Sequence, residues 1–204
     1  MHPDRNDRMI ETQIAARGIR DERVLEAFRS VPRQLFVPPG LEADAYDDSP
    51  LAIGYGQTIS QPYIVALMTS LLELRGTESV LEVGTGSGYQ TAILGRLARV
   101  VYSAELQPGL SSAVPRHLEH LGIRNVFLAE GDARTVHRAS APFDRILAAA
   151  APEDVPGDLL AQLAEGGRAI LPIGRDVQHL WLFERHGGNI SKKRLDAVRF
   201  VPML

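Results

Sequence analysis

The feature that most constrains the fold is a glycine-rich stretch near the middle of the chain, residues 82–88, with the sequence EVGTGSG. It follows a short apolar run, Val80-Leu81, and precedes an apolar helical pattern over residues 89–97. A strand, a glycine turn and a helix in this order form a nucleotide-binding βα unit, in which glycines let a ligand approach bare backbone. The chain is therefore predicted to hold a nucleotide-like ligand at the end of this strand.

The spacing of the glycines separates two classes of ligand. A dinucleotide fingerprint, G-x-G-x-x-G, would need a glycine where this chain has Tyr89. The glycines instead occupy every second position, and Glu82 stands two residues before the first of them. This E-x-G-x-G-x-G pattern resembles the S-adenosylmethionine loop of class I methyltransferases. That ligand has no pyrophosphate to bind, so the loop chiefly needs to be free of side chains where the ligand lies against it. The N-terminus of the following helix can still favour the ligand's carboxylate.

A second acid is expected one strand further on, where the ribose hydroxyls of such a ligand would arrive. The apolar run over residues 100–104 is predicted to be that strand, and it ends in Glu105. Glu105 lies 21 residues after Gly84 (105 − 84 = 21), close to the ~20 expected for a ribose-binding carboxylate. The loop, its preceding acid and the spaced Glu105 together favour a nucleoside cofactor over a tight turn without a ligand.

Composition narrows the protein class. The chain has 204 residues, 45% hydrophobic and 23% charged, as expected for one ordinary globular domain. Its formal net charge is −3 and it has no Lys/Arg run that would track a phosphate backbone, so no nucleic-acid partner is expected. The absence of cysteine excludes disulfides, thiolate catalysis and cysteine zinc sites. The N-terminus lacks the apolar core of a signal peptide, and no membrane span is expected. The expectation is a cytoplasmic protein, with a monomer as the default.

The pattern of elements predicts an α/β fold with a mostly parallel sheet. From residue 79 onward, strand and helix patterns alternate with short connections, which implies parallel strands covered by helices on both faces. The expected strands are residues 80–83, 100–104, 126–129, 143–148 and 168–171, and the expected helices are 89–97, 110–121 and 158–163. Residues 180–184 and 195–201, around a Gly187-Gly188 turn, read as an antiparallel hairpin. A mostly parallel sheet with an antiparallel C-terminal element resembles the Rossmann-like architecture of class I methyltransferases, which is the fold expected here.

Residues 1–75 are expected to form a helical, substrate-lid part of one domain that spans residues 1–204, and residues 76–204 its cofactor-binding core. One helix is predicted over residues 9–17, and Asp21 is predicted to cap a second. Residues 44–56 read as loop. Ser60 is predicted to be the N-cap of an amphipathic helix whose first turn contains Pro62.

Several segments carry a sharper resemblance. Residues 54–62, GYGQTISQP, and residues 198–202, VRFVP, are the specific ones; further matching segments are residues 9–13, 17–19, 31–33, 36–38, 81–90, 141–144, 162–163 and 166–168. Along nearly its whole length, and in order, the chain resembles the protein-L-isoaspartate O-methyltransferases. The resemblance implies a repair enzyme that methylates the free α-carboxylate of L-isoaspartyl residues in damaged proteins and peptides. The methyl donor would be S-adenosylmethionine, the product S-adenosylhomocysteine, and the ester would cyclise to a succinimide.

The chemistry of such a reaction suits this sequence. A carboxyl group with a pKa near ~4 is ionised at neutral pH, so it needs no general base. Catalysis can then be mostly orientation of the carboxylate oxygen, the methyl carbon and the sulfur. The resemblance implies that Ser60 donates a hydrogen bond that aims the substrate carboxylate at the methyl group. Ser60 is thus the predicted catalytic residue, in addition to its expected role as a helix cap.

The resemblance also assigns the remaining site residues. Those implied to bind the cofactor are Thr58, Ile59, Glu82, Gly84, Thr85, Gly86, Ser87, Gly88, Glu105, Leu106, Asp132 and Ala133. Asp132 would accept a hydrogen bond from the adenine amino group, and the backbone N–H of Ala133 would meet a ring nitrogen. Asp132 could equally be the N-cap of the following turn. The residues implied to bind the substrate are Gln61, Val201 and Pro202, and for the last two a buried C-terminal strand is an equal alternative.

The chain departs from the family pattern where Ala133 replaces a usual glycine, and where residues 146–152 lack a polar residue at the end of the fourth strand. Two other functions therefore stay open: an aspartate carboxyl methyltransferase that modifies a dedicated peptide, and a catalytically silent S-adenosylmethionine-binding regulatory protein. A metal site is not expected. His117 and His120 lie three apart on a predicted helix, but no third ligand accompanies them.

Overall fold

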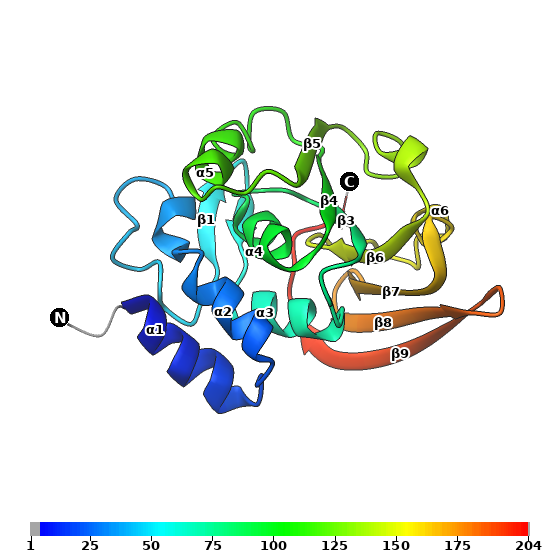
Figure 1. The fold of residues 1–204 in the computed structure, drawn as a ribbon, viewed down its shortest axis with the longest axis horizontal. Helices are drawn as coiled ribbons and strands as arrows, with labels where there is room; N and C mark the ends of the chain where they lie inside the picture. Colours follow the sequence, from blue (N-terminus) through cyan, green and yellow to red (C-terminus); the bar gives the residue numbers. More distant parts are fainter. Residues whose placement is uncertain (1–4, 204) are drawn as a thin grey trace.

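A seven-stranded sheet forms the centre of the computed structural model, which describes residues 5–203 (Figure 1). Its strand order is β5-β4-β3-β6-β7-β8-β9. The parallel strands are β3 (Ser79–Val83), β4 (Val100–Glu105), β5 (Val126–Glu130), β6 (Phe143–Ala148) and β7 (Leu163–Ile173). The antiparallel strands are β8 (Gln178–His186) and β9 (Asn189–Val198). The predicted parallel sheet with an antiparallel C-terminal element is confirmed.

The sheet has a switch point at β3. The chain builds outward from β3 through β4 to β5, then returns to the other side of β3 to add β6. In register, Val83 lies beside Ala104 of β4 and Ala148 of β6, so the carboxyl ends of these strands meet at one edge. Open α/β sheets bind ligands in the crevice outside such a switch point. The topology therefore places the glycine loop, which follows Val83, at the expected binding edge.

Two hydrophobic cores lie on opposite faces of the sheet. Alternate residues of β3 divide between them: Val80 belongs to the larger core and Leu81 to the smaller. The larger core also contains apolar residues of α4 (Tyr89–Leu97), α5 (Val114–His120) and the N-terminal helices, whereas α6 (Gly157–Leu160) contributes Leu159 and Leu160 to the smaller. Helices thus cover both faces, as predicted.

The N-terminal helices follow the sequence signals closely. α1 (Arg5–Met9) continues as a π-helical turn and then a 3₁₀ turn to Arg17, and it ends at Gly18 with φ +96°. α2 (Glu22–Arg29) begins after Asp21, whose Oδ1 accepts a hydrogen bond from the backbone N–H of Arg23 at 2.9 Å. Both boundaries were predicted from the glycine stop and the aspartate cap.

The segment before α3 (Pro62–Leu71) differs from the prediction in two ways. The helix N-cap is Gln61, and it makes no side-chain capping bond, so the assignment of Ser60 as the cap is wrong. Pro62 at the first helical position fixes φ and has no N–H, so one of the unpaired donors of the first turn is absent. Second, residues 44–56 are not all loop.

The segment of residues 44–56, predicted to be loop, includes β1 (Leu51–Gly54), which pairs in antiparallel fashion with β2 (Gln57–Ile59). Gly54, Tyr55 and Gly56 all have positive φ and form the turn of this hairpin.

Several elements have different bounds from those expected. The first helical segment begins at Arg5 rather than at residue 9, and β9 covers Asn189–Val198 rather than residues 195–201. α5 begins at Val114 rather than at residue 110, and α6 ends at Leu160 rather than at residue 163. β7 is longer than expected because it begins at Leu163, where the sequence pattern suggested the end of a helix. Within residues 5–203, no helix is long and apolar enough to cross a bilayer.

Candidate active site

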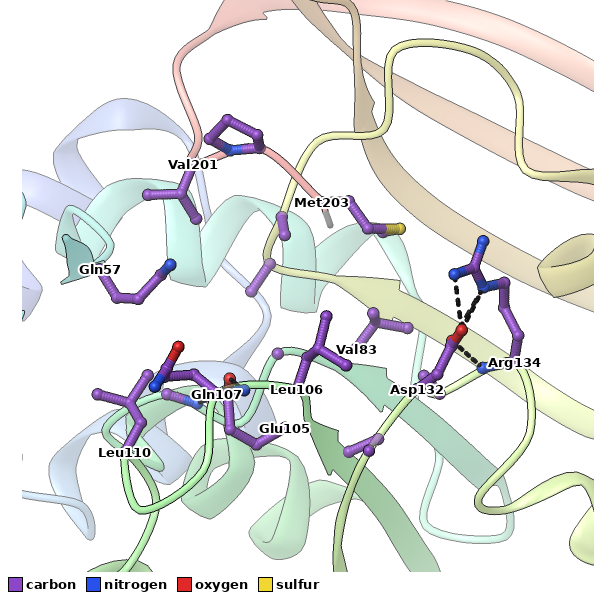
Figure 2. Close-up of a pocket in the computed structure, with 18 of the residues that line it drawn as sticks. Gln57, Val83, Glu105, Leu106, Gln107, Leu110, Asp132, Arg134, Val201 and Met203 are labelled. Atoms are coloured by element: carbon purple, nitrogen blue, oxygen red, sulfur yellow. Dashed lines mark hydrogen bonds and ion pairs between the residues drawn. The ribbon is translucent and has the colours of Figure 1, made fainter. Parts of the chain in front are cut away.

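The main pocket opens at the carboxyl ends of β3, β4 and β5 and encloses about 830 Å³ including its mouth (Figure 2). The predicted site residues in its wall are Thr58, Gly84, Gly86, Glu105, Leu106, Asp132, Ala133, Val201 and Pro202. These residues come from five parts of the sequence, which the fold brings together at one pocket. Further wall residues that the sequence did not single out include Ile53, Gln57, Gln107, Leu110, Arg134, Leu159 and Met203.

The glycine loop is a thin backbone wall of this pocket. Gly84, Gly86 and Gly88 have φ values of +93°, +53° and +86°, a region that L-residues with a Cβ rarely adopt. The backbone N–H of Gly84 donates to the Ala104 carbonyl at 2.8 Å, which ties the loop to β4. A Cβ on Gly88 would lie 2.7 Å from Cγ1 and 2.8 Å from Cγ2 of Val114 on α5. Gly88 is thus required by both backbone conformation and packing.

We expect Gly88→Ala to lower the free energy of unfolding by about 2 kcal/mol more than Gly18→Ala does. Both glycines have a left-handed φ, so both substitutions strain the backbone, but nothing lies within 4 Å of a Cβ at Gly18. Only Gly88→Ala adds the cost of overpacking against Val114, typically about 1–3 kcal/mol. Urea unfolding of the two variants measures the difference. Equal losses would show that the contact with Val114 relaxes freely.

Glu105 links the two loops that frame the main pocket. Its side-chain Oε2 accepts from the backbone N–H of Gly86 at 2.8 Å, and its Oε1 accepts from the backbone N–H of Gln107 at 2.9 Å. A carboxylate has about four lone-pair sites, so each oxygen keeps one for a further donor. Glu105 is buried but lines the pocket, which puts these sites where a ligand diol could reach them. The geometry agrees with the predicted ribose-binding role.

Asp132 lies at the other side of the pocket, after a sharp turn at Gly131 with φ +130°. The backbone N–H of Gly131 donates to the Glu105 carbonyl at 2.7 Å, so the loops after β4 and β5 are joined. The Asp132 side chain also accepts from the backbone N–H of Arg134 at 2.8 Å, as a capping residue would. The two alternatives for Asp132 are compatible in this structure: it stabilises its own turn and faces the pocket. Ala133 is buried in the adjacent wall.

Two further hollows adjoin the main pocket. The inner pocket is lined by Thr58, Ile59, Ser60, Val65, Met68, Gly84, Thr85, Gly86, Ser87, Tyr89, Gln90, Leu147, Ala149 and Phe200. The outer groove is lined by Pro50, Thr58, Ser60, Gln61, Ile64, Ala149, Ala197, Val198, Arg199, Phe200 and Val201. Thr58 and Ala149 belong to the walls of all three hollows, and Ser60 borders both the inner pocket and the outer groove. Ser60 therefore lies where two separate ligands could meet.

The C-terminal segment forms part of the wall of the main pocket and the outer groove. After β9 it runs back toward the carboxyl ends of the parallel strands (Figure 1). The Ala151 N–H donates to the Val201 carbonyl and the Met203 N–H donates to the Ala151 carbonyl, both at 2.8 Å. Val201 is half-buried and Pro202 exposed, outside the bounds of β9. A buried C-terminal strand is therefore not what this segment forms, and its side chains face the hollows instead.

Glu82 and Gly88 are the predicted site residues that line none of these three hollows. The Glu82 side chain is fully buried beneath the loop, where its Oε2 accepts from Thr91 Oγ1 at 2.6 Å and from Ser103 Oγ at 2.5 Å. Ser103 Oγ is in turn 2.6 Å from Thr85 Oγ1. Glu82 therefore lies beneath the glycine loop rather than in the wall of any of the three hollows. Side chains alternate along β3, and the one at Glu82 faces α4 rather than the pocket.

Burial raises the pKa of Glu82 to about 7, although the hydrogen bonds from Ser103 and Thr91 favour the charged form. The folded-state pKa lies above the ordinary value of 4.5. Between these two pH values, Glu82 is protonated in the folded state but ionised in the unfolded state. The free energy of unfolding should then fall as pH rises from about 4.5 to about 7, by roughly 3 kcal/mol from this group, and stay level above that range. Glu82→Gln, which mimics the protonated acid, should lack this contribution. Urea unfolding at pH 5 and pH 8 tests it, and parallel pH profiles for the two proteins would contradict it.

His117 and His120, three residues apart on α5, have different surroundings. The His117 ring packs edge-on against Phe36 with centroids 5.3 Å apart, and His120 is exposed. Between residues 5 and 203 there is no group of three or more His, Cys, Asp or Glu residues arranged to hold a metal ion.

Comparison with known protein sequences identifies relatives along nearly the whole chain. The sequence model of the protein-L-isoaspartate(D-aspartate) O-methyltransferases matches residues 4–204. A protein-L-isoaspartate O-methyltransferase of Syntrophobacter fumaroxidans is 50% identical over 97% of this chain and 93% of its own length. One of Anaeromyxobacter dehalogenans is 54% identical over 91% of both chains.

Solved structures give the same result. A Plasmodium falciparum protein of this kind, determined in complex with S-adenosyl-L-homocysteine, superposes with a TM-score of 0.83 at 27% identity and covers 97% of both chains. A second protein-L-isoaspartate O-methyltransferase gives a TM-score of 0.87 at 27% identity, and this chain spans 65% of its length. With its sheet, its motifs and its relatives in agreement over nearly every residue, this chain belongs to the protein-L-isoaspartate(D-aspartate) O-methyltransferase family.

Proposed function

We propose that this protein transfers a methyl group from S-adenosylmethionine to the free α-carboxylate of L-isoaspartyl residues in damaged proteins and peptides. The ester then cyclises to a succinimide, which opens in part to normal aspartate, and S-adenosylhomocysteine is the other product. The observation that carries this proposal is that the three hollows meet at Thr58 and Ala149, with Ser60 between the inner pocket and the outer groove. One ligand can reach Ser60 from the inner pocket, and a peptide can reach it from the outer groove.

The residues of the main and inner pockets fit S-adenosylmethionine. Glu105 offers carboxylate oxygens to a ribose diol, and Asp132 offers an acceptor to an adenine amino group. The glycine loop keeps the wall free of side chains: a Cβ on Gly84 would lie 3.6 Å from Ala149 Cβ, and one on Gly86 would lie 3.4 Å from Ile53 Cδ1. When bound, the cofactor supplies a methyl group activated by a sulfonium leaving group.

The protein's own contribution to the reaction is orientation. A substrate carboxylate is already ionised at neutral pH, so the site needs a hydrogen-bond donor rather than a base. Ser60 supplies a neutral hydroxyl that makes no hydrogen bond with any other residue between 5 and 203. Arg199 is the one charged residue among those that line the outer groove. A neutral donor aims the carboxylate without strongly stabilising its ground state, and well-oriented reactants account for much of such a rate.

We also propose that residues 1–75 supply much of the surface that receives the peptide. Pro50, Ser60, Gln61 and Ile64 form one side of the outer groove, and residues 197–201 form the other. Gln61 is positioned by its Nε2, which donates to the Asp48 carbonyl at 3.2 Å. A cytoplasmic monomer that uses no nucleic-acid or membrane partner completes the proposal, and size-exclusion chromatography tests its oligomeric state.

A single assay tests the function. The protein is incubated with methyl-labelled S-adenosylmethionine and with matched peptides that contain either L-isoaspartate or L-aspartate, and base-labile methyl ester is counted. Label on the isoaspartyl peptide alone is the expected result. Label on the aspartyl peptide instead would indicate a peptide-modifying aspartate methyltransferase. Cofactor binding without label on either peptide would indicate a regulatory protein.

A further inference from the structure

The side chain and the backbone N–H of Arg134 both contact the carboxylate of Asp132 at the edge of the main pocket (Figure 2). Its Nε donates to Oδ1 at 2.9 Å and to Oδ2 at 2.7 Å, and its Nη2 lies 2.6 Å from Oδ2. Its backbone N–H also donates to Oδ1, at 2.8 Å. Sequence reasoning did not identify Arg134, because an arginine two residues after an aspartate has no distinctive spacing.

The pair is held in place by the turn that carries it. The Asp132 carbonyl accepts from the backbone N–H groups of Thr135 and Val136, both at 2.9 Å. The Arg134 carbonyl accepts from Gln162 Nε2 at 3.4 Å. The Arg134 and Asp132 side chains are 46% and 34% exposed, so the pair borders the pocket rather than being sealed in the core. The pair therefore lies where a ligand in the main pocket could meet the Asp132 carboxylate.

The hydrogen-bonding capacity of this carboxylate is almost used up. Arg134 makes four contacts with the two oxygens but supplies only three protons to them, because the single Nε–H is shared between Oδ1 and Oδ2. Of about four lone-pair sites, this leaves about one for a further donor, and the ionised carboxylate has no proton of its own to donate. The hydrogen bond from the Arg134 side chain is also the main cause that lowers the pKa of Asp132, so the group stays ionised near neutral pH. A group that can only accept pairs with an exocyclic amine and repels a carbonyl oxygen.

We propose that Arg134 is a specificity-determining positioning residue, which fixes the Asp132 carboxylate so that the site selects a 6-aminopurine cofactor over its 6-oxo counterpart. This inference rests on the proposed function, because it takes the ligand to be an adenosyl cofactor. A guanidinium fork fixes the plane of a carboxylate through parallel hydrogen bonds, which a lysine ammonium cannot do. Without the fork, the carboxylate keeps one bond to the backbone and can rotate away from the ligand.

The test compares S-adenosyl-L-homocysteine with S-inosyl-L-homocysteine by isothermal titration calorimetry. The second ligand has an oxo group in place of the 6-amino group and carries a proton on the adjacent N1. We expect the unmodified protein to prefer the adenosyl ligand by on the order of 100-fold, since sites built to hydrogen-bond a group reject analogues that lack it. Arg134→Ala should reduce that ratio to about tenfold or less, and Arg134→Lys should restore little of it. Asp132→Asn should abolish or reverse the preference, because an amide can donate to a 6-oxo group.

Arg138→Ala is the matched control. Arg138 is exposed in the same loop, and it is not among the residues that line the main pocket. Its replacement changes the net charge by the same amount, so the variant should keep the full preference for the adenosyl ligand. Equal loss of affinity for both ligands in Arg134→Ala, with the ratio intact, would overturn the inference and leave Arg134 a structural role only. An unmodified protein that binds neither ligand would instead contradict the proposed function itself.

Discussion

Replacing Ser60 with alanine is expected to lower kcat about 100-fold while the dissociation constant for S-adenosylhomocysteine changes by less than about threefold. Removal of one well-placed donor at a reacting oxygen typically has an effect of this size. Ser60 lines the inner pocket and the outer groove but not the main pocket, where the nucleoside is proposed to lie. Because Ser60 is not the N-cap of α3, the substitution should also cost little stability.

Initial rates of methyl ester formation on an isoaspartyl peptide, together with calorimetric titration of S-adenosylhomocysteine, separate the two effects. Ser60→Thr keeps the hydroxyl and should recover part of the rate, while Ser111→Ala, whose side chain lies outside the three hollows, should behave as the unmodified protein. A parallel fall in turnover and in cofactor affinity would mean that Ser60 serves the cofactor rather than the substrate carboxylate.

Glu105→Ala should have the largest effect on binding, with a loss of cofactor affinity on the order of 100- to 1000-fold. The substitution removes the proposed acceptor of the ribose hydroxyls, and hydrogen bonds to a charged group contribute about 1.5–3 kcal/mol each. It also releases the backbone N–H groups of Gly86 and Gln107, so the two loops that frame the main pocket lose their common anchor. Binding would then require both loops to be ordered again.

Glu130 offers a closely matched control for this experiment. It occupies the position on β5 that pairs with Glu105 on β4, but it is exposed and does not line the main pocket. Glu130→Ala should therefore leave cofactor affinity within about threefold, as measured by the same titration. If the two alanine variants bound equally well, the ribose-binding role of Glu105 would have to be abandoned.

The α/β core was predictable because its signals are local. Apolar runs, glycine turns and their spacing specify each βα unit, and α4 has the bounds expected from its apolar pattern. The loop glycines and Glu105 could be identified for the same reason: backbone that must be thin requires glycine, and the ribose position fixes the spacing of the acid. These requirements can be read from a short stretch of sequence without knowing the tertiary structure.

The errors arose where tertiary structure decides the outcome. The direction of Glu82 depends on which face of β3 is turned toward α4, and the spacing of a motif does not contain that information. The β1–β2 hairpin was overlooked because it is short and its turn consists of residues typical of loops. Ser60 resembled a cap because serine is common just before a helix, whereas α3 begins one residue later than that reading requires and has Gln61 at its N-cap.

The way the chain's last residues are fastened has a practical consequence. Gln178 clamps Phe200, since its Nε2 donates to the Phe200 carbonyl at 3.1 Å and its Oε1 accepts from the Phe200 N–H at 2.6 Å. Beyond that clamp, the segment is held mainly by its bridge to Ala151. Affinity tags and fusion partners are therefore best attached at the amino end. A bulky group joined directly after this segment would disturb the wall shared by the main pocket and the outer groove, where the methyl donor and the substrate peptide are proposed to bind.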